Sequence, residues 1–562
     1  MSKPAVDEKI IPLTTSGGFI SYNFLTSAKP MLPSEHQKAI NRIANHFSIE
    51  AKLHTGFTKT FRGAQNDMRK QRIIVPRFGL PEICNAKFNL ADYKISSLLT
   101  DGTPPQVPFR WLAEQSANQK LIANHIISNI YNEKNVAIGQ AGTIVDLETG
   151  QGKSFLACYL IAHIQKKAAI IVHSTSLIEQ WTGVIKRSLG DTSIGYYYGG
   201  KHQIGDIMIM VVDSATHDEF KFGKQKIPCL DYWRQFGLII YDECHTYAND
   251  TGLQVLRRAQ SRYMLGLSAT PNQHIMGFDK MVWWHLGPIL ETKKLIGYSL
   301  DEEKSTVHVH QIQYYGHPNF TKKITNEKLG KIDVVNTITM LCNDPHRDQM
   351  IISCIIDAMK LNLFTFVFSD RRESLLRLQK KLCEKLAQNS DTNPLMTNED
   401  EFMRIVGGAT NTDLENADIK ARVIFTTYQY MGTGKSIIKM NGLIFATPRR
   451  RGTQQFIGRI LRKGSDMSVT RHIWDIQDMR VSLAGQWRER KKFYDSRKYN
   501  ILPQKLTYES FVNIGTVQDI PIDNIDNVDD IDDVEDIDTD ITSSIPSVSA
   551  LLDLVKSKSS AE

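Results

Sequence analysis

Short apolar runs alternate with amphipathic stretches between about residues 106 and 295. The runs include Ala169–Val172, Ile207–Val212, Gly237–Ile240 and Met264–Leu267. A run that is apolar at every position is typical of a strand that a parallel sheet buries on both faces. Because these runs alternate with helical patterns, they predict an α/β unit in which helices cover both faces of a parallel sheet.

A second unit of the same kind is predicted at residues 341–510. Its apolar runs are Phe364–Phe368, Val423–Phe425 and Leu443–Phe445. The chain is long enough for two to four domains, so two α/β units with additional segments fit its length. The predicted fold class is therefore α/β, with two parallel-sheet lobes.

The remaining segments differ from these two units. Residues 1–105 have weak periodicity and end in the turn-forming run Asp101–Pro105, which predicts an N-terminal accessory domain. Residues 296–340 are predicted to be a connector with some strand of its own. In residues 511–562, apolar side chains recur at every third position from Ile522 to Ile537 among acidic and amide residues. That period fits neither a strand nor an α-helix, so this tail is predicted to be disordered.

The charge of the chain is unevenly distributed. The 562 residues carry a formal net charge of +7, from 68 basic and 61 acidic side chains. The tail contains 13 of the acidic residues and two of the basic ones, which leaves 66 basic and 48 acidic residues, a net +18, in residues 1–510. Such a basic body predicts a polyanionic partner, above all nucleic acid. The alternative interpretation is that the Lys and Arg side chains only keep a large protein soluble.

Other features of the composition narrow the class of protein. No apolar run reaches the ~18–20 residues of a membrane span, and the first residues lack the apolar stretch of a secretory signal. The seven cysteines are scattered and include no C-x-x-C pair. They predict an intracellular protein in a reducing compartment, without a zinc or iron–sulfur site.

A phosphate-binding loop is predicted at Glu148–Ser154, between an apolar strand and a helix. Gly150 and Gly152 allow the backbone to turn its N–H groups towards a polyphosphate at the N-terminus of that helix. Lys153 would reach the β- and γ-phosphates, and the Ser154 hydroxyl would bind Mg²⁺. The residues expected to bind ATP are Thr149, Gly150, Gln151, Gly152, Lys153 and Ser154.

About ninety residues later, the run Leu238–Tyr241 ends in two adjacent carboxylates, Asp242 and Glu243. Asp242 is expected to hold Mg²⁺, and Glu243 to orient and deprotonate the attacking water. A strand that ends in this pair, downstream of a phosphate loop, predicts hydrolysis of a nucleoside triphosphate, ATP.

The chain contains a second G-x-G-K-S sequence, Gly432–Ser436. The pattern after it predicts another short strand, Asn441–Ala446, rather than the amphipathic helix that a phosphate loop requires. We therefore assign the phosphate site to the first copy, at Lys153, and not to Lys435.

Taken together, these sequences resemble superfamily 2 helicases over residues 106–500. Two subgroups are most similar: the transcript-release DNA helicases of large DNA viruses of the poxvirus type, and the transcription-coupled repair helicases. The segments that carry the resemblance are Lys153 (motif I), His173–Thr175 with Gln180 and Trp181 (Ia), Asp242–His245 (II), Ser268–Thr270 (III), Phe368–Arg372 (IV), Thr427–Gly434 (V) and Gln455–Arg462 (VI).

The resemblance implies two recA-like lobes with ATP between them. It implies that Gln455, Arg459 and Arg462 of the second lobe act at the nucleotide, with Arg462 as the arginine finger that meets the charge on the γ-phosphate. Gln119 stands where the family has an adenine-reading glutamine, and a surface helix residue is the alternative interpretation. Ser436 departs from the family pattern, which usually has an acidic residue or Asn there.

Two further segments suggest contact with nucleic acid. Phe57–Phe78 interleaves basic and aromatic side chains, and Arg488–Tyr494 predicts a basic helix after the strand Trp474–Ile476. For both segments, a solvated charged surface is the alternative interpretation.

The sequence thus predicts a Mg²⁺-dependent, nucleic-acid-stimulated ATPase that moves along one strand and displaces its partner strand. DNA is the expected track, with RNA as the second candidate. The same motifs are also compatible with a duplex translocase or an ATP-gated clamp. The acidic tail is expected to bind a protein partner or to compete with nucleic acid for the basic body. A viral origin would place the protein in the host cytoplasm or nucleus, and in the virion as a further site.

Overall fold

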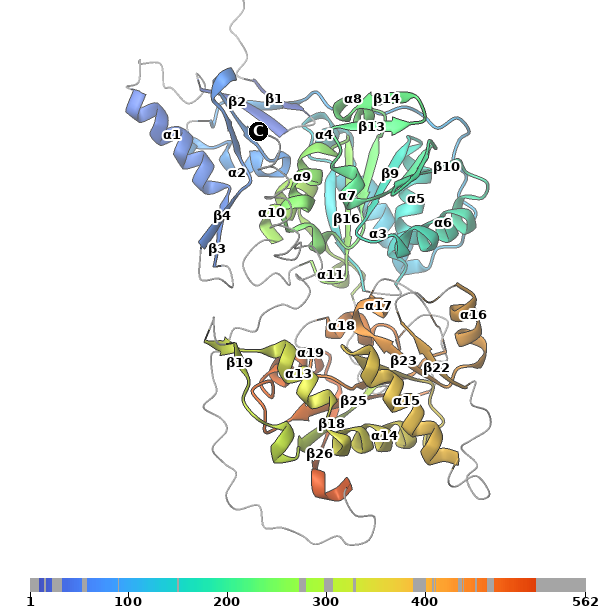
Figure 1. The fold of residues 1–562 in the computed structure, drawn as a ribbon. Coiled ribbons are helices and arrows are strands. Elements are labelled where there is room, and N and C mark those ends of the chain that lie inside the picture. The colour runs from blue at the N-terminus through green and yellow to red at the C-terminus, as the bar shows by residue number, and fades with distance from the viewer. Residues whose placement is uncertain are drawn as a thin grey trace, which may run out of the picture. The chain divides into compact units, whose positions relative to one another are not determined.

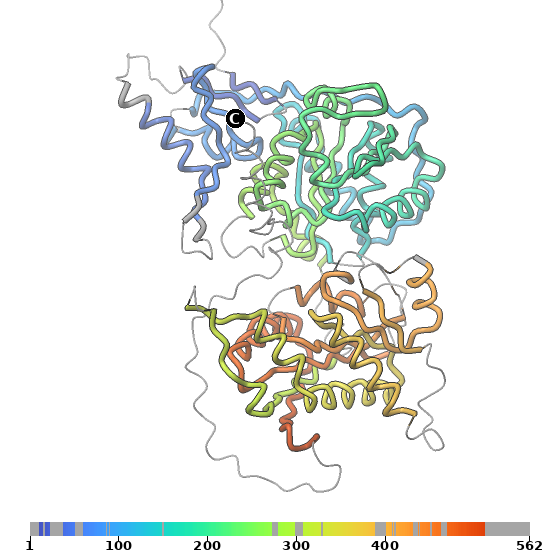
Figure 2. Tube along the Cα trace, in the orientation of Figure 1, coloured from blue at the N-terminus to red at the C-terminus, as the bar shows by residue number. Residues whose placement is uncertain are grey.

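The computed structural model divides the chain into two compact units, which are described separately (Figure 1). The first contains Met1–Glu302, Gln429–Lys439 and Gln454–Met467, and the second contains the remaining segments. Figure 2 traces the chain through both units. The structure describes residues 10–14, 17–22, 33–52, 58–88, 90–148, 151–271, 279–297, 307–326, 330–387, 401–406, 409, 411–432, 437, 439–449, 452–461 and 469–511.

An eight-stranded sheet forms the centre of the first unit, with the order β11-β10-β12-β9-β15-β16-β8-β17. Neighbouring strands are parallel except at the edge, where β11 runs antiparallel to β10. This confirms the predicted parallel sheet. In chain order the strands are β8 (Gly142–Asp146), β9 (Ala168–Val172), β10 (Ile194–Tyr198), β11 (Lys201–Gln203), β12 (Ile207–Val211), β15 (Leu238–Tyr241), β16 (Tyr263–Ser268) and β17 (Ile289–Glu291).

Helices cover both faces of this sheet, as the continuous apolar runs predict. In β9, Ile170 points into one hydrophobic core and Ile171 into the other, because successive side chains of a strand face opposite ways. The first core includes side chains from α3 (Ala117–His125), α5 (Lys153–Ile164) and α6 (Ser176–Leu189). The second includes side chains from α7 (Val212–Ala215), α8 (Cys229–Arg234), α9 (Asp250–Arg258) and α10 (Asp279–Leu286).

The order of three neighbouring strands, β15-β16-β8, determines where the site forms. The three strands are parallel, so their carboxyl ends lie at one edge of the sheet. The phosphate loop follows β8, the Asp242–Glu243 pair follows β15, and Ser268 ends β16. Segments that are far apart in sequence therefore meet at the edge where ligands bind in open α/β sheets.

The N-terminal residues build a smaller sheet that belongs to the same unit. Its order is β5-β6-β2-β1-β7, beside a hairpin of β3 and β4 and the helix α1. The bounds are β1 (Ile10–Thr14), β2 (Gly17–Ser21), α1 (Pro33–His46), β3 (Ser48–Lys52), β4 (Thr58–Arg62), β5 (Gln65–Asp67), β6 (Arg72–Val75) and β7 (Lys94–Ser97). A two-stranded hairpin, β13 (Glu219–Phe222) and β14 (Gln225–Pro228), extends the main lobe.

One buried arginine joins the N-terminal sheet to the main lobe. Arg77 is 1% exposed and donates hydrogen bonds to the backbone oxygens of Gly139, Ser261 and Arg262. Phe78, beside it, is also buried. The expectation of a surface interleaving basic and aromatic side chains is therefore wrong for these two residues, because both are used to dock the domain.

The second unit contains a seven-stranded, fully parallel sheet with the order β22-β23-β21-β24-β25-β18-β26. Its strands are β18 (Val307–Tyr315), β21 (Thr365–Ser369), β22 (Phe402–Ile405), β23 (Val423–Thr427), β24 (Gly442–Phe445), β25 (Arg471–Asp478) and β26 (Asn500–Thr507). Its helices include α13 (Val334–Cys342), α14 (Pro345–Lys360), α15 (Arg372–Ala387), α16 (Asn411–Lys420) and α19 (Gln486–Ser496). Two α/β lobes with parallel sheets confirm the predicted fold class, whereas the acidic tail lies outside the described residues.

The segment Arg488–Tyr494 forms part of α19, and one of its charges faces inward. Arg490 is 1% exposed, and its guanidinium makes two-pronged contacts of 2.7–3.0 Å with the Asp475 carboxylate of β25. The predicted basic face is therefore wrong for Arg490, which pairs with a buried carboxylate.

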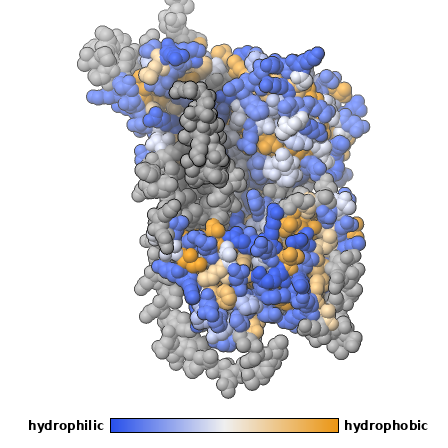
Figure 3. All heavy atoms as spheres, in the orientation of Figure 1, coloured by the Kyte–Doolittle hydropathy of each residue, from blue (hydrophilic) through white to orange (hydrophobic). Residues whose placement is uncertain are grey.

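Hydrophilic side chains dominate the described surface that Figure 3 shows, with apolar side chains scattered among them. Among the described residues, no helix combines the length and the apolar character that crossing a membrane requires.

Candidate active site

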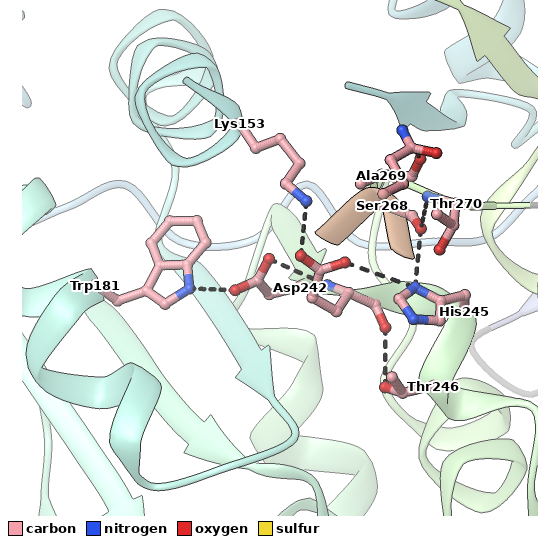
Figure 4. Close-up of polar contacts among 10 residues, drawn as sticks. Lys153, Trp181, Asp242, His245, Thr246, Ser268, Ala269 and Thr270 are labelled. Atoms are coloured by element: carbon pink, nitrogen blue, oxygen red, sulfur yellow. Dashed lines mark hydrogen bonds and ion pairs between the residues drawn. The ribbon is translucent and has the colours of Figure 1, made fainter. Parts of the chain in front are cut away.

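The candidate site lies at the carboxyl ends of β8, β15 and β16, at the N-terminus of α5 (Figure 4). Gly152 caps this helix with a φ of +89°, a left-handed conformation that favours glycine. A Cβ on Gly152 would stand 2.1 Å from the Gln119 Nε2, so a side chain there would displace the Gln119 amide as well as strain the backbone. No side chain caps the helix, which leaves its first N–H groups for an anion.

Gln119, the predicted adenine-reading residue, lies against the phosphate loop. Its Nε2 donates to the Gln151 backbone oxygen over 3.2 Å, and its Oε1 accepts from the Ser116 N–H over 3.0 Å. Ser116 Oγ in turn accepts from the Gln119 N–H, which completes a capping box on α3. The side chain therefore links the start of α3 to the loop, while Thr149 and Gly150 lie outside the described residues.

Lys153 makes the central contact of the site. Its Nζ lies 2.7 Å from the Glu243 Oε1, and the Lys153 side chain is 9% exposed. Burial alone would raise the pKa of the Glu243 carboxyl, but the charge and hydrogen bond of Lys153, together with the neighbouring His245 and His173, outweigh it and lower that pKa to about 2. Glu243 is therefore a carboxylate at neutral pH. This carboxylate is the partner that holds the Lys153 ammonium.

The backbone of Glu243 is in a left-handed conformation, with φ +45° and ψ +53°. This conformation is uncommon for a residue with a side chain. Three hydrogen bonds hold it. The Thr246 hydroxyl and the Thr246 N–H each donate to the Glu243 carbonyl over 2.9 Å, and the Glu243 N–H donates to the Asp242 Oδ1 over 3.1 Å. A strained residue at the end of a central strand is typical of functional sites.

Asp242 is held from the opposite side by Trp181 of α6, whose Nε1–H donates to the Asp242 Oδ2 over 2.8 Å. Asp242 is 6% exposed. Burial, and then the neighbouring Glu243 charge, raises the pKa of the Asp242 carboxyl, while Lys153 and the Trp181 hydrogen bond act against them. The sequence places Trp181 in motif Ia without a role, and the structure makes it the side chain that orients Asp242.

His245 connects this carboxylate pair to the end of β16. Its Nδ1 lies 2.9 Å from the Ser268 Oγ and 3.6 Å from the Glu243 Oε2. The same Ser268 Oγ accepts a hydrogen bond of 3.0 Å from the Thr270 N–H. Figure 4 shows His245 pointing at Ser268 and Thr270, so motifs II and III form one hydrogen-bonded network.

The residues of motif VI are only partly described. Gln455 lies in α18 (Thr453–Ile457), and Arg459 is 3% exposed, whereas Arg462 lies outside the described residues. Gln454, grouped with the first unit, donates to the Ala269 oxygen over 3.1 Å. In the second G-x-G-K-S sequence, Gly432 ends α17 (Tyr428–Gly432), and Lys435 lies outside the described residues. The strand β24 follows it, as predicted.

The residues present fit a nucleotide and its metal ion. The uncapped N-terminus of α5 and Lys153 offer donors and positive charge to phosphates, and Asp242 offers carboxylate oxygens. Among the described residues, no three His, Cys, Asp or Glu side chains are grouped closely enough to hold a metal on their own. Mg²⁺ is usually held by one or two carboxylates together with substrate phosphates and water, so this donor set suits Mg²⁺.

Comparison with known proteins supports the same class. Residues 114–273 match the family model "Type III restriction enzyme, res subunit". QP509L of African swine fever virus (isolate Pig/Kenya/KEN-50/1950), named as a predicted ATP-dependent RNA helicase, is 28% identical over 380 residues, which cover 65% of this chain and 70% of the relative. The transcript termination protein A18 of cowpox virus (strain Brighton Red) is 23% identical over 407 residues, covering 68% of this chain and 73% of A18.

Among solved structures, T4 UvsW aligns over 84% of this chain and 96% of its own, with 15% identity and a TM-score of 0.31. The fold assignment therefore rests on the sheet topology.

The motifs and the relatives confirm the class that the sequence predicts. The chain resembles superfamily 2 helicases and is similar to proteins of large DNA viruses. Its function is that of an ATP-dependent helicase.

Proposed function

We propose that this helicase hydrolyses Mg²⁺-ATP at Lys153, Asp242 and Glu243, and uses the energy to move along a nucleic-acid strand and displace its partner. The observation that carries the proposal is the 2.7 Å contact between the Lys153 Nζ and the Glu243 Oε1 at the N-terminus of α5. It brings a phosphate-binding cation and a water-activating carboxylate into one site.

Nucleotide binding changes the partner of Lys153 in this account. The γ-phosphate attracts Lys153 away from Glu243, and the freed carboxylate takes a proton from the attacking water. Asp242 and the Ser154 hydroxyl hold the metal, and the Trp181 N–H keeps the Asp242 carboxylate in position. A Mg²⁺ ion held by Asp242 and Ser154 would supply positive charge that offsets the charge of the phosphates.

The remaining nucleotide contacts are proposed from the motifs. Backbone N–H groups of Thr149–Ser154 bind the phosphates, and Gln119 reads the adenine after exchanging its hydrogen bond to the Gln151 oxygen. Gln455 and Arg459 complete the site, and Arg462 is the arginine finger. An arginine that comes from the second lobe would make closure of the two lobes a condition of hydrolysis.

DNA is the proposed track. The relatives are proteins of large DNA viruses, and one is named as a transcript termination protein, which supports a role in viral transcription inside an infected host cell. The net charge of +18 on residues 1–510 suits any phosphate backbone. RNA is the second candidate, because other relatives are named as RNA helicases. The acidic tail is proposed to bind a protein partner or to cover the basic body.

The test is to measure the ATPase rate of the full chain in parallel with single-stranded DNA, duplex DNA and RNA, and then strand displacement on a tailed duplex. Stimulation by single strands together with displacement supports a helicase. Stimulation by duplex without displacement supports a duplex translocase instead. An ATPase rate that no nucleic acid changes contradicts the proposal.

A further inference from the structure

A pocket of about 670 Å³ lies within the first unit, and none of the residues that line it belongs to a helicase motif. Strands β4 and β5 of the N-terminal domain form one wall, and helix α9 of the main lobe forms the other. The side chains that matter to its chemistry are Phe61, Arg62, Gln65, Asn66, Asp250 and Arg257. Its volume is in the range of pockets that hold small organic ligands.

The pocket combines cationic, aromatic and amide groups. The Arg257 Nη2 donates to the Arg62 backbone oxygen, which ties α9 to the N-terminal domain. The Arg257 Nε is buried and makes no hydrogen bond among the described residues. Burial lowers the pKa of the Arg257 guanidinium, and the Asp250 charge acts in the opposite direction. A guanidinium that has lost water without gaining enough acceptors is stabilised by an anion.

The other groups narrow the class of ligand. The Phe61 ring is half-buried and packs against the hydrophobic core of the unit, and Met68, at the pocket margin, is 71% exposed. Gln65 brings an amide side chain that donates and accepts hydrogen bonds. The Asn66 Oδ1 accepts from the Tyr22 hydroxyl, so Asn66 offers the ligand its amide N–H groups. A phosphate alone would need only the arginines. An aromatic face, two amides and two guanidinium groups together suit a nucleobase joined to a phosphate.

We infer that this pocket binds one nucleotide of a single nucleic-acid strand, with the base against Phe61 and the phosphate at Arg62 and Arg257. The inference rests on the proposed function, because that function makes a nucleic-acid strand the substrate. It places a strand contact on the N-terminal domain, outside the helicase motifs.

The pocket is also connected to the catalytic carboxylates. Its helix, α9, begins at Asp250, close after the 3₁₀ turn Cys244–Tyr247 that follows Glu243. The packing between turn and helix is tight, since a Cβ on Gly252 would stand 2.3 Å from the Tyr247 oxygen. The Tyr247 hydroxyl donates to the Ile171 oxygen over 2.8 Å inside the core. A strand bound at Arg257 therefore contacts the helix that supports the site of hydrolysis.

The experiment measures binding of a fluorescent 12-nucleotide strand to the full-length protein by anisotropy at several salt concentrations. Arg257→Gln is expected to weaken binding about 10-fold and to lower the slope of log K against log salt by about 0.7, the value for one phosphate contact on a single strand. Arg234→Gln is the matched control, because Arg234 has an exposed side chain paired with Asp231 on α8. Equal affinities and slopes for these two variants would overturn the inference.

Further variants separate recognition from folding. Phe61→Leu is expected to weaken binding about 10-fold, whereas Phe61→Tyr keeps the ring and should bind like the wild type. Arg62→Gln changes an exposed side chain, so it tests the phosphate contact even if Arg257→Gln unfolds the protein. Equal losses for Phe61→Leu and Phe61→Tyr contradict a stacking role.

A strand and a free nucleotide share this chemistry, so both are titrated. Thymidine monophosphate is titrated with the ATP site filled by saturating ADP. If Arg257→Gln loses thymidine monophosphate binding but keeps strand binding, the pocket takes a free nucleotide, and the inference that it binds a strand is overturned. Wild-type ATPase stimulation tests the proposed function independently. If nucleic acid stimulates the wild-type ATPase but the pocket variants bind the strand normally, only the pocket inference is refuted. If the pocket variants bind the strand weakly but nucleic acid does not stimulate the wild-type ATPase, only the proposed function is refuted.

Discussion

The Lys153 Nζ lies 2.7 Å from the Glu243 Oε1, so the proposed phosphate-binding cation and the proposed water-activating carboxylate form an ion pair. The ion pair keeps Glu243 ionised, with a pKa of about 2, and ready to act as a base when Lys153 turns to the γ-phosphate. In this account, nucleotide binding itself activates the base.

Glu243→Gln should therefore separate binding from hydrolysis. The glutamine cannot take a proton from water, so turnover is expected to fall at least ~10²-fold. The variant should bind ATP as tightly as the wild type or more tightly, because ATP no longer has to break an ion pair between Lys153 and the carboxylate at position 243. Equilibrium binding of labelled ATP and single-turnover hydrolysis measure the two effects. Glu219→Gln, on the β13–β14 hairpin, is the control, and weaker ATP binding in Glu243→Gln alone would contradict the account.

Trp181→Phe should weaken the metal site. The change removes the N–H that Asp242 accepts over 2.8 Å, and a hydrogen bond to a charged group contributes about 1.5–3 kcal/mol. The pKa of Asp242 should then rise further, and the Mg²⁺ concentration for half-maximal ATPase should increase several-fold. Trp233→Phe, at another fully buried tryptophan of the same unit, controls for lost packing. An equal Mg²⁺ requirement in both variants would show that Trp181 only packs.

Arg462→Ala tests the arginine finger. Removing the guanidinium that is proposed to meet the γ-phosphate should reduce turnover by about 10³-fold, with a smaller effect on ATP affinity. Arg459→Lys is the comparison, since Arg459 is buried and its truncation to alanine endangers the fold. Rapid-quench measurement of hydrolysis with saturating nucleic acid gives both values. Near-normal hydrolysis by Arg462→Ala would assign the finger to Arg459 or to another residue.

A histidine pair predicts acid sensitivity of the second unit. The His310 Nε2 lies 2.9 Å from the His472 Nδ1, and His308 is close to both. Burial, with the neighbouring histidines, lowers the pKa of His472 to about 4 and also lowers the pKa of His310. The unfolded chain therefore binds more protons between pH 6.5 and about 4, and the free energy of unfolding falls as the pH falls through this window.

The measurement is the melting temperature of wild type and His472→Gln from pH 7.5 to pH 5. The difference in stability between the two proteins should shift in favour of the variant as the pH falls. Parallel curves over this range would show that the pair does not titrate on unfolding.

Motifs I, II and III were predictable because each follows or ends a strand with an apolar run. The structure adds that these strands, β8, β15 and β16, are neighbours in the sheet. What the sequence did not reveal depends on tertiary contacts. Trp181 gives no local sign that its N–H will reach Asp242, 61 residues later. The sequence pattern predicts surface positions for Arg77 and Arg490, yet both are buried. Arg77 binds backbone oxygens of a distant segment, and Arg490 binds the Asp475 carboxylate. A run of charged residues in the sequence does not show which of them will be exposed and which will be buried, because it does not show which distant residue each will contact.

The most direct test compares ATP turnover of Lys153→Ala and Lys435→Ala with saturating single-stranded DNA, after melting curves confirm that both are folded. Lys153→Ala removes the cation next to Glu243, so turnover should collapse and ATP binding should weaken. Lys435→Ala should keep ATP binding and lose only part of the stimulation by DNA. Loss of ATP binding in Lys435→Ala, with normal turnover in Lys153→Ala, would contradict the assignment of the active site.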